Sequence, residues 1–421
     1  MHISDKLKFK LLDLSLLQMF ALPLFPSNLK PYNIAFFGLV ILFINRKNDF
    51  TFDFKSFFIN SSIYLLMILS LLYSENLHYA FKKLETMASL IIFPMIFSLY
   101  PQTMIKKLQH NRNRYMIVFF GSVLLFNAIS FIYHLGHHKS MIFIHYPTLN
   151  RIAQGAFNIH PIYLSMHICI ALLFSFFIII EVKSNYKKAV LIFLDFLLIG
   201  FLFILIKKGP VIVLGITFLL FLLFQRNKRL LYVGLAIMVI NLVVISSIPE
   251  YREKFSELTK VDNVETGGIT STNIRYNIYK SSIKKIIESP LIGFGVGDHK
   301  DELLESLKKD SPILYEGKYN SHNQYISFTL SMGLIGLLTF LCFLCYNLTL
   351  AIRYDNQVLI LLLIFYGLTM SFENILERED GVIYFSFFIG YFALYTRYTH
   401  SLELNKGTEK TERSTVTSTI K

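Results

Sequence analysis

Residues 189–206 read AVLIFLDFLLIGFLFILI, and this stretch decides the fold of the chain. Its only charged residue is Asp195. A helix rises about 1.5 Å per residue, so a run of this length crosses nearly all of a hydrocarbon core of roughly 30 Å. Because an unpaired backbone amide costs several kcal/mol in lipid, the run must close its hydrogen bonds internally. It is therefore expected to be a transmembrane helix.

Comparable runs recur on both sides of this stretch. Of the 421 residues, 54% are hydrophobic, 15% aromatic and only 16% charged, which is far less charge than a soluble domain carries. We predict an all-α polytopic integral membrane protein with about twelve spans, over residues 11–26, 32–45, 56–73, 84–100, 115–134, 159–181, 189–206, 209–225, 230–249, 324–346, 356–372 and 381–397.

One polar segment interrupts these runs and divides the chain. Residues 1–249 are expected to form a bundle of about nine helices, residues 250–323 a large extracytoplasmic loop, and residues 324–398 about three further helices. Residues 399–421 are rich in Thr, Ser, Lys and Glu, and too poor in apolar residues to fold, so a disordered cytoplasmic tail is expected.

Lysine and arginine are concentrated in alternate connections between the predicted spans. If the N-terminus is cytoplasmic, the inner connections hold most of them, as in Lys183, Lys187 and Lys188. The distribution predicts a multi-pass protein of the cytoplasmic (inner) membrane, with both termini cytoplasmic and residues 250–323 on the periplasmic side. The net charge of +13 is then explained by topology and contact with membrane lipids, not by nucleic-acid binding.

The loop begins with helical spacing of apolar residues. Between Ile274 and Ser289 the isoleucines recur at helical intervals, with lysines between them, which predicts an amphipathic helix able to lie on the membrane surface. Arg275 is expected at the start of this helix, beside free backbone amides, an arrangement suited to phosphate oxygens. An ordinary interfacial arginine is the alternative interpretation.

The end of that helix is marked by Pro290 and the glycine turn of residues 293–297. No strand precedes these glycines, which argues against a dinucleotide site. Asp298 is expected to cap a short helix that runs to Lys309. Capping accounts for the acidic residues here, and the histidines at 134, 137, 138 and 145 are interpreted as ordinary loop residues, so no metal site is predicted.

His322 lies at the amino end of the predicted span 324–346, separated from it by Asn323. At the amino end of a helix the dipole disfavours the imidazolium, so the ring is expected to stay neutral and able to accept a proton from a hydroxyl. The alternative is an interfacial histidine that only forms hydrogen bonds. Position alone favours this alternative over a catalytic role.

A resemblance to a known family bears on this choice. The chain resembles the O-antigen ligase and polymerase family of polytopic glycosyltransferases, which have the C-type glycosyltransferase architecture. The residues that carry it are His322, Asn323, Gly333 and Gly336 after the loop, and Arg275, Tyr279, Pro290, Gly293, Gly295 and Gly297 within it, with His160 to Ser165 and Glu373 to Gly381 further away. Tyr279 stands where many members have Trp.

The resemblance implies a donor glycan on a polyprenyl diphosphate, an inverting and metal-independent transfer, and no cofactor. His322 would orient or deprotonate the acceptor hydroxyl, and Arg275 would stabilise the departing diphosphate. The family tends to carry an arginine where this chain has Lys207 and Lys208, and we expect the charge contact mainly from Lys208. Further substrate contacts are expected from Asn323, Tyr279, Gly293, Gly295, Gly297, Glu373, Glu377 and Arg378. A solvated hairpin turn is the alternative for the acidic stretch around Glu373.

Four functions are weighed against these residues. A ligase would transfer the glycan to lipid A-core or another surface acceptor, whereas a polymerase would extend the lipid-linked repeat. A single large outer loop slightly favours the ligase. A polysaccharide or lipid transporter would need several charged groups within the spans, where Asp195 is nearly alone. A structural scaffold gives no reason for Arg275 and His322 to share one outer segment.

Overall fold

The computed structural model describes residues 4–45, 52–137, 159–205, 207–224 and 246–419, with isolated positions between 232 and 243. Within these ranges the regular elements are all helices, and no strand occurs. The prediction of an all-α protein is confirmed. The histidines at 138 and 145, and most of the predicted span 230–249, lie outside the described residues.

Six described helices are long and apolar enough to cross a membrane, which makes this a multi-pass membrane protein. They cover Ser27–Ile44, Phe54–Tyr73, Arg112–Tyr133, Pro161–Glu181, Asn185–Leu205 and Gln324–Arg353, and shorter apolar helices cover Ser89–Ser98, Lys208–Leu223 and Gln357–Thr369. These helices do not by themselves establish the predicted number of about twelve spans.

The helices before the loop are α1 (Asp5–Phe20), α2 (Lys30–Ile44), α3 (Phe54–Ser70), α4 (Leu77–Met87), α5 (Ser89–Ser98), α6 (Gln102–His110), α7 (Arg112–His137), α9 (Pro161–Glu181), α10 (Asn185–Leu205) and α11 (Lys208–Phe224). Two predicted spans are not continuous. The run 11–26 ends as α1 at Phe20, because Pro23 and Pro26 follow, and the run 84–100 is divided between α4 and α5.

The loop contains α13 (Pro249–Ser256), α14 (Val264–Gly267), α15 (Ser271–Glu288), α16 (His299–Asp310) and α17 (Pro312–Glu316), and is followed by α18 (Gln324–Arg353), α19 (Gln357–Thr369) and α20 (Glu379–Thr419). Short 3-10 turns include η3 (Leu71–Tyr73) and η4 (Ile375–Glu377). Helix α20 continues to Thr419, across residues where the sequence analysis predicted a disordered tail, and no proline interrupts this stretch.

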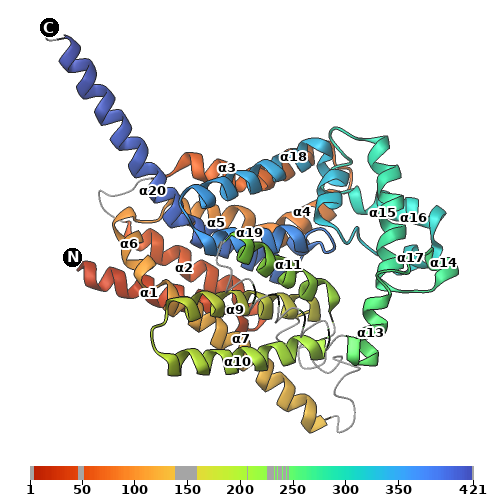
Figure 1. Ribbon diagram of the computed structural model, residues 1–421. Coiled ribbons are helices and arrows are strands. Elements are labelled where there is room, and N and C mark those ends of the chain that lie inside the picture. The colour runs from red at the N-terminus through yellow and green to blue at the C-terminus, as the bar shows by residue number, and fades with distance from the viewer. Residues whose placement is uncertain are drawn as a thin grey trace.

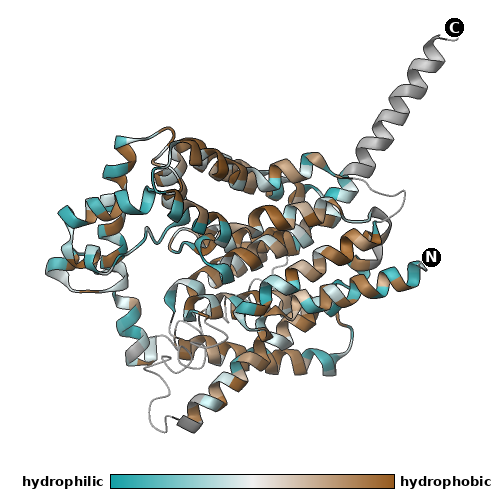
Figure 2. Ribbon diagram, turned by 180° about the vertical axis from the view of Figure 1, so that it is seen from behind, coloured by the Kyte–Doolittle hydropathy of each residue, from teal (hydrophilic) through white to brown (hydrophobic). Residues whose placement is uncertain are grey.

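The apolar helices lie side by side in one bundle, and the loop helices α13 to α17 stand at the end opposite both termini (Figure 1). Helix α9 runs through the interior, with 89% of its most apolar window buried, whereas only 17% of the α10 window is buried. Brown, hydrophobic ribbon dominates the bundle, and teal, hydrophilic ribbon is prominent in the loop (Figure 2). Helices α9 and α10 are therefore similarly apolar in sequence, but α9 is buried and α10 is peripheral.

The loop helices have a small core of their own. Val264, Ile278, Leu303, Leu307 and Leu314 are buried together, and Leu330 of α18 completes this cluster. Burial of this apolar surface holds α15 and α16 against the outer part of α18. The loop is therefore a folded unit attached to the bundle, and the two helices predicted within it are confirmed.

Helix α18 is broken at Gly333, whose φ of 64° and ψ of −161° are not helical. The turn after α15 fills the break. The amides of Phe294 and Gly295 donate to Leu330 O and Ser331 O, both at 2.8 Å, and Leu334 N donates to Pro290 O at 2.8 Å. The backbone groups that the break leaves open are thus paired with the loop.

Candidate functional site

The site forms around Glu373, in the connection between α19 and α20. Its side chain is buried, with the residue 8% exposed. Glu373 Oε2 lies 3.8 Å from Arg275 Nη2 of α15 and 3.5 Å from His322 Nδ1, which precedes α18. The alternative of a solvated hairpin is therefore wrong for Glu373. Three segments far apart in sequence converge on one carboxylate.

Arg275 is held in a fixed orientation. Its Nε donates to Phe372 O at 3.0 Å, and its Nη1 donates to Ser271 O, one helical turn earlier, at 3.0 Å. These bonds orient the planar guanidinium and leave Nη2 facing Glu373. Thr270 caps α15 by accepting from Asn273 N, so Arg275 lies in the second turn of the helix. The prediction that it sits beside the free amides of the helix start is wrong.

His322 adopts a strained backbone conformation. Its φ of 44° is in the left-handed region, which side chains other than glycine rarely occupy. Hydrogen bonds on both sides hold it there, since His322 N donates to Asn320 Oδ1 at 3.2 Å and His322 O accepts from Tyr279 Oη at 3.1 Å. The buried Nδ1 has no hydrogen-bond partner among the described residues, and Glu373 is the carboxylate it faces.

Asn323 and Tyr279 hold the histidine in place. Asn323 is the N-cap of α18: its Oδ1 accepts from Tyr325 N at 3.0 Å and Ile326 N at 3.1 Å, and its Nδ2 donates to Ser371 O at 2.9 Å. The Tyr279 hydroxyl lies within hydrogen-bond distance of both His322 O and Ser371 O. Both side chains thus join the start of α18 to the connection that carries Glu373. Sequence analysis predicted substrate contacts for them.

The two lysines at the start of α11, Lys207 just before it and Lys208 as its first residue, lie in different environments. Lys208 Nζ pairs with Glu257 Oε2 at 2.7 Å and donates to Lys254 O at 3.1 Å, so its charge is already compensated. Lys207 has no ion pair within the described part of the chain. Burial lowers its pKa, and the charges of Lys254 and Arg275 lower it further while Glu373 opposes them. Lys207, and not the predicted Lys208, is the lysine left available near Glu373.

His160 also borders the site, and sequence reasoning did not select it as a site residue. As the N-cap of α9 it accepts a hydrogen bond from Ile162 N through Nδ1, at 3.3 Å. Burial lowers its pKa, as do the nearby charges of Lys207 and Arg378. The ring is therefore neutral near pH 7, with its Nε2 as the donor. The available signal was a histidine directly before a buried span.

Glu377 lies four residues beyond Glu373 and has a different role. Lys83 of α4 pairs with it, Asn374 Nδ2 donates to it at 3.0 Å, and the Ser327 hydroxyl donates to it as well. Although burial opposes this, the Lys83 ammonium lowers the pKa of Glu377 to about 2. Its hydrogen-bonding capacity is used within the fold. Arg378, by contrast, is exposed and has no ion pair among the described residues.

The glycine turn serves packing. A side chain at Gly293 would collide with Leu330 O of α18, one at Gly295 with Ser74, and one at Gly297 with Asn76 O. Asp298 does not cap α16 with its side chain; instead its carboxylate accepts from the amides of Glu75 and Asn76, both at 2.8 Å. The close backbone approach predicted for these glycines is an approach to the bundle, which docks the loop.

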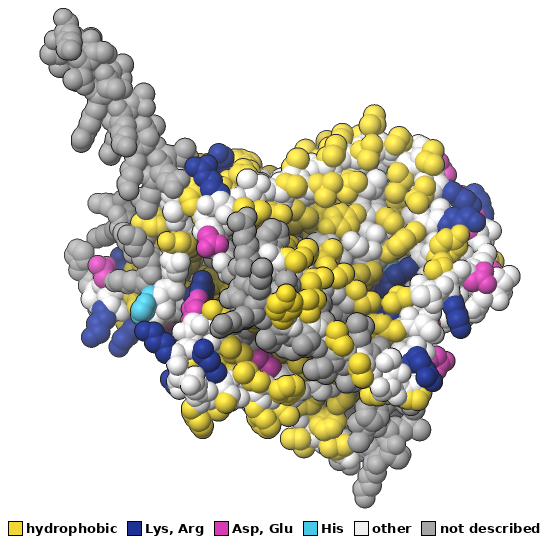
Figure 3. All heavy atoms as spheres, in the orientation of Figure 1, with side chains coloured by type: hydrophobic (Ala, Val, Ile, Leu, Met, Phe, Trp, Pro, Cys, Tyr) yellow, Lys and Arg dark blue, Asp and Glu magenta, His cyan; other side chains and the backbone are white. Residues whose placement is uncertain are grey.

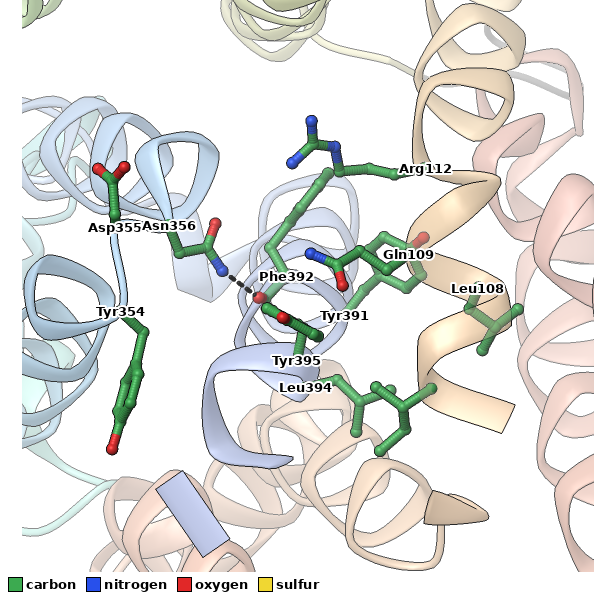
Figure 4. Close-up of a pocket in the computed structure, with 11 residues that line it drawn as sticks. Leu108, Gln109, Arg112, Tyr354, Asp355, Asn356, Tyr391, Phe392, Leu394 and Tyr395 are labelled. Carbon is green, nitrogen blue, oxygen red and sulfur yellow. Dashed lines mark hydrogen bonds between the residues drawn. The ribbon is translucent and has the colours of Figure 1, made fainter. Parts of the chain in front are cut away.

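A cavity of about 110 Å³ lies between α6, α7, α20 and the turn before α19 (Figure 4). Tyr391, Tyr395 and Arg112 are among its lining residues, and Asn356 Nδ2 donates across it to Phe392 O at 2.7 Å. None of the predicted site residues lines this cavity. Arg112 is paired with Glu181. The cavity is therefore distinct from the site around Glu373.

The site thus belongs to a multi-pass helical membrane protein in which a folded loop brings an arginine and a histidine to a carboxylate at one end of the bundle. Residues 193–341 match the family model described as O-antigen ligase, which confirms the resemblance to the O-antigen ligase family. Arg275, Tyr279, His322 and Asn323 lie within the matched region, whereas Glu373 lies outside it. No curated protein matches the chain.

Proposed function

We propose that this protein transfers a glycan from a polyprenyl-diphosphate carrier to an acceptor hydroxyl, most simply that of lipid A-core or another surface glycolipid. The observation that carries the proposal is the convergence of Arg275 and His322 on the buried carboxylate of Glu373. The match of residues 193–341 to the O-antigen ligase family model supports the reaction class. The excess of lysine and arginine in alternate connections supports an active site on the periplasmic side of the cytoplasmic membrane and both termini in the cytoplasm.

His322 acts as the general base in this proposal. Its Nδ1 faces Glu373, so the carboxylate favours the tautomer that carries the proton on Nδ1 and leaves Nε2 free to accept one. The acceptor hydroxyl loses its proton to Nε2 while its oxygen attacks the anomeric carbon. The bond from that carbon to the diphosphate oxygen breaks on the opposite face, which inverts the configuration.

The cations around Glu373 stabilise the diphosphate as negative charge develops on it. Arg275 offers Nη2, and Lys207 and Arg378 have no ion pair among the described residues. His160 adds a neutral Nε2 donor beside them. Preorganised donors of this kind act without further reorganisation, and losing one costs about 10²–10³-fold in rate. Diphosphate is also a good leaving group, so the proposed reaction is independent of metal ions.

The test is reconstitution in liposomes with a polyprenyl-diphosphate glycan and lipid A-core. The native protein is expected to form glycan-bearing lipid A-core, and His322→Ala and Arg275→Ala are each expected to reduce the initial rate by about 10²-fold or more. Lys309→Ala is a matched control, because this loop lysine is exposed and, among the described residues, pairs only with Glu305 of its own helix.

Two outcomes would change the conclusion. Longer lipid-linked chains without transfer to lipid A-core would identify a polymerase that uses the same donor chemistry. Unaltered rates in both His322→Ala and Arg275→Ala, with folded protein confirmed by thermal unfolding, would overturn the mechanism.

A further inference from the structure

Helix α15 and the turn after it expose an apolar face. Ile283 and Ile287 of α15 are 55% and 72% exposed, and Leu291 and Ile292 of the turn are 64% and 50% exposed. Ile283, Ile287 and Leu291 are spaced four residues apart along the chain. From the helical spacing of its isoleucines, the sequence analysis predicted an amphipathic helix. The structure buries Ile278 in the loop core and packs Ile274 and Ile286 against it.

This apolar face continues into the surface of the bundle. Tyr73 Oη donates to Ile292 O at 2.8 Å, and its neighbour Leu72 is 87% exposed. On α18 the amide of Leu334 bonds to Pro290 O, and the Leu334 side chain is itself exposed. Ile283, Ile287, Leu291, Ile292 and Leu72, here called the interfacial patch, therefore join the loop to the helix surface that faces lipid.

The orientation of α15 suits a membrane boundary. It runs across the direction of the spanning helices, near the end of the bundle (Figure 1). On the visible face, hydrophobic side chains cover the bundle, and lysine and arginine side chains gather toward its two ends (Figure 3). Lys280 is exposed on α15, one turn before the apolar residues. At the end of the bundle, the exposed apolar residues of such a helix can contact the acyl chains while the neighbouring lysine reaches the lipid headgroups.

We propose that the interfacial patch lies in the lipid leaflet on the loop side, with its apolar side chains at the boundary between headgroups and acyl chains. Continuity with the lipid-facing surface of α3 and α18 favours lipid over a protein partner, because a contiguous exposed apolar surface of a membrane protein at this level is in contact with the bilayer. The leaflet then helps to hold α15, and with it Arg275, at a fixed height. This proposal does not depend on the transfer reaction.

The test measures contact with lipid directly. Cys342 and Cys345 are exposed on α18 and Cys169 is buried, so single cysteines are introduced into a Cys342→Ser/Cys345→Ser protein. Ile287→Cys and Leu291→Cys are labelled with an environment-sensitive fluorophore in nanodiscs of phosphatidylethanolamine and phosphatidylglycerol. Lys309→Cys, on the exposed side of α16, is the matched control.

Spin-labelled phospholipid is expected to quench the two patch labels at least about twofold more than the control, whereas aqueous iodide is expected to quench the control more. Quenching of the patch labels by iodide alone would show a solvated surface and overturn the proposal. Protection from both quenchers would show a protein contact, such as a second copy of the chain, and would also overturn it. Ile283→Ser in the Leu291→Cys protein is expected to weaken the lipid quenching, which links the separate residues of the patch.

Discussion

Glu373 and Glu377 lie four residues apart in the connection between α19 and α20, yet they have different environments. Glu377 accepts hydrogen bonds from Lys83, Ser327 and Asn374 and is buried at the centre of a satisfied network. Glu373 faces Arg275 and His322 at 3.8 and 3.5 Å, beyond ordinary hydrogen-bond length, and the Nδ1 it faces has no other partner among the described residues. A satisfied carboxylate stabilises the fold, whereas an incompletely satisfied one beside a strained histidine is available for chemistry.

The largest effect is expected from His322→Gln, which removes the base but keeps a polar side chain. We expect the transfer rate to fall by about 10²–10⁴-fold, because a positioned general base contributes about that much. Initial rates in proteoliposomes measure it. If the variant keeps both its activity and its native thermal stability, His322 is not the general base, and the functional role assigned to Glu373 and its neighbours is lost.

Glu377→Gln is expected to lower the free energy of unfolding by about 3 kcal/mol, because it leaves the Lys83 ammonium without its carboxylate inside the protein. Thermal unfolding in detergent measures the loss. Activity per folded molecule is expected to stay near that of the native protein. A variant as stable as the native protein would show that Glu377 is not the structural member of the two.

The pH dependence of stability checks the same carboxylate. Against the opposition of burial, Lys83 lowers the pKa of Glu377 from 4.5 to about 2 in the folded protein. The native state therefore binds fewer protons than the unfolded state, and the stability from this group is complete above pH 4.5 and is lost as the pH falls toward 2. Glu377→Gln is expected to lack this component of the acid-induced loss.

Glu373→Gln is the matched substitution at the other carboxylate. We expect the rate to fall by about 10–100-fold, because the neutral amide no longer favours the Nδ1 tautomer or stabilises the imidazolium. The free energy of unfolding is expected to change by less than about 1 kcal/mol, since the carboxylate makes no short bond to either partner. A large loss of stability with an unchanged rate would show that Glu373, like Glu377, stabilises the fold and takes no part in the reaction.

Lys207→Met is expected to raise the KM for the lipid-linked donor by about tenfold, because it removes an uncompensated positive charge near Glu373. Lys208→Met is the comparison, since Lys208 is already paired with Glu257. It is expected to change the donor KM by less than about twofold. A larger rise in donor KM for Lys208→Met than for Lys207→Met would show that Lys208 is the lysine that contacts the donor.

The smallest effect is expected from His160→Asn, because asparagine keeps the N-cap of α9 while it shortens the side chain. A fall in rate of about threefold, without a change in thermal stability, would match one weak hydrogen bond to the diphosphate. His160→Ala is expected to lower stability by about 1 kcal/mol in addition, through loss of the cap. Equal rates for the native protein and His160→Asn would limit His160 to capping.

The sequence predicted the elements better than their contacts. Apolar runs and helical spacing located most of the spanning helices and both α15 and α16, because those patterns are local. Arg275 and His322, which the sequence analysis predicted to act at one site, both face the Glu373 carboxylate. The roles of Glu373 and Glu377 were not separable, since Lys83 and Glu377 meet across 294 positions of sequence. The contacts of Asp298 and of the glycine turn were not predicted for the same reason: their partners lie in the turn between η3 and α4, and on α18.

The turn that fills the break in α18 has a consequence for the order in which the protein matures. The outer part of α18, which begins at Gln324, two residues after His322, completes its backbone bonds only with Phe294 and Gly295 in place. A chain whose loop has not yet folded therefore holds its spanning helices but lacks a positioned histidine. Under the proposed function, we expect such a chain to be inserted but inactive, so that transfer begins only after the loop has docked.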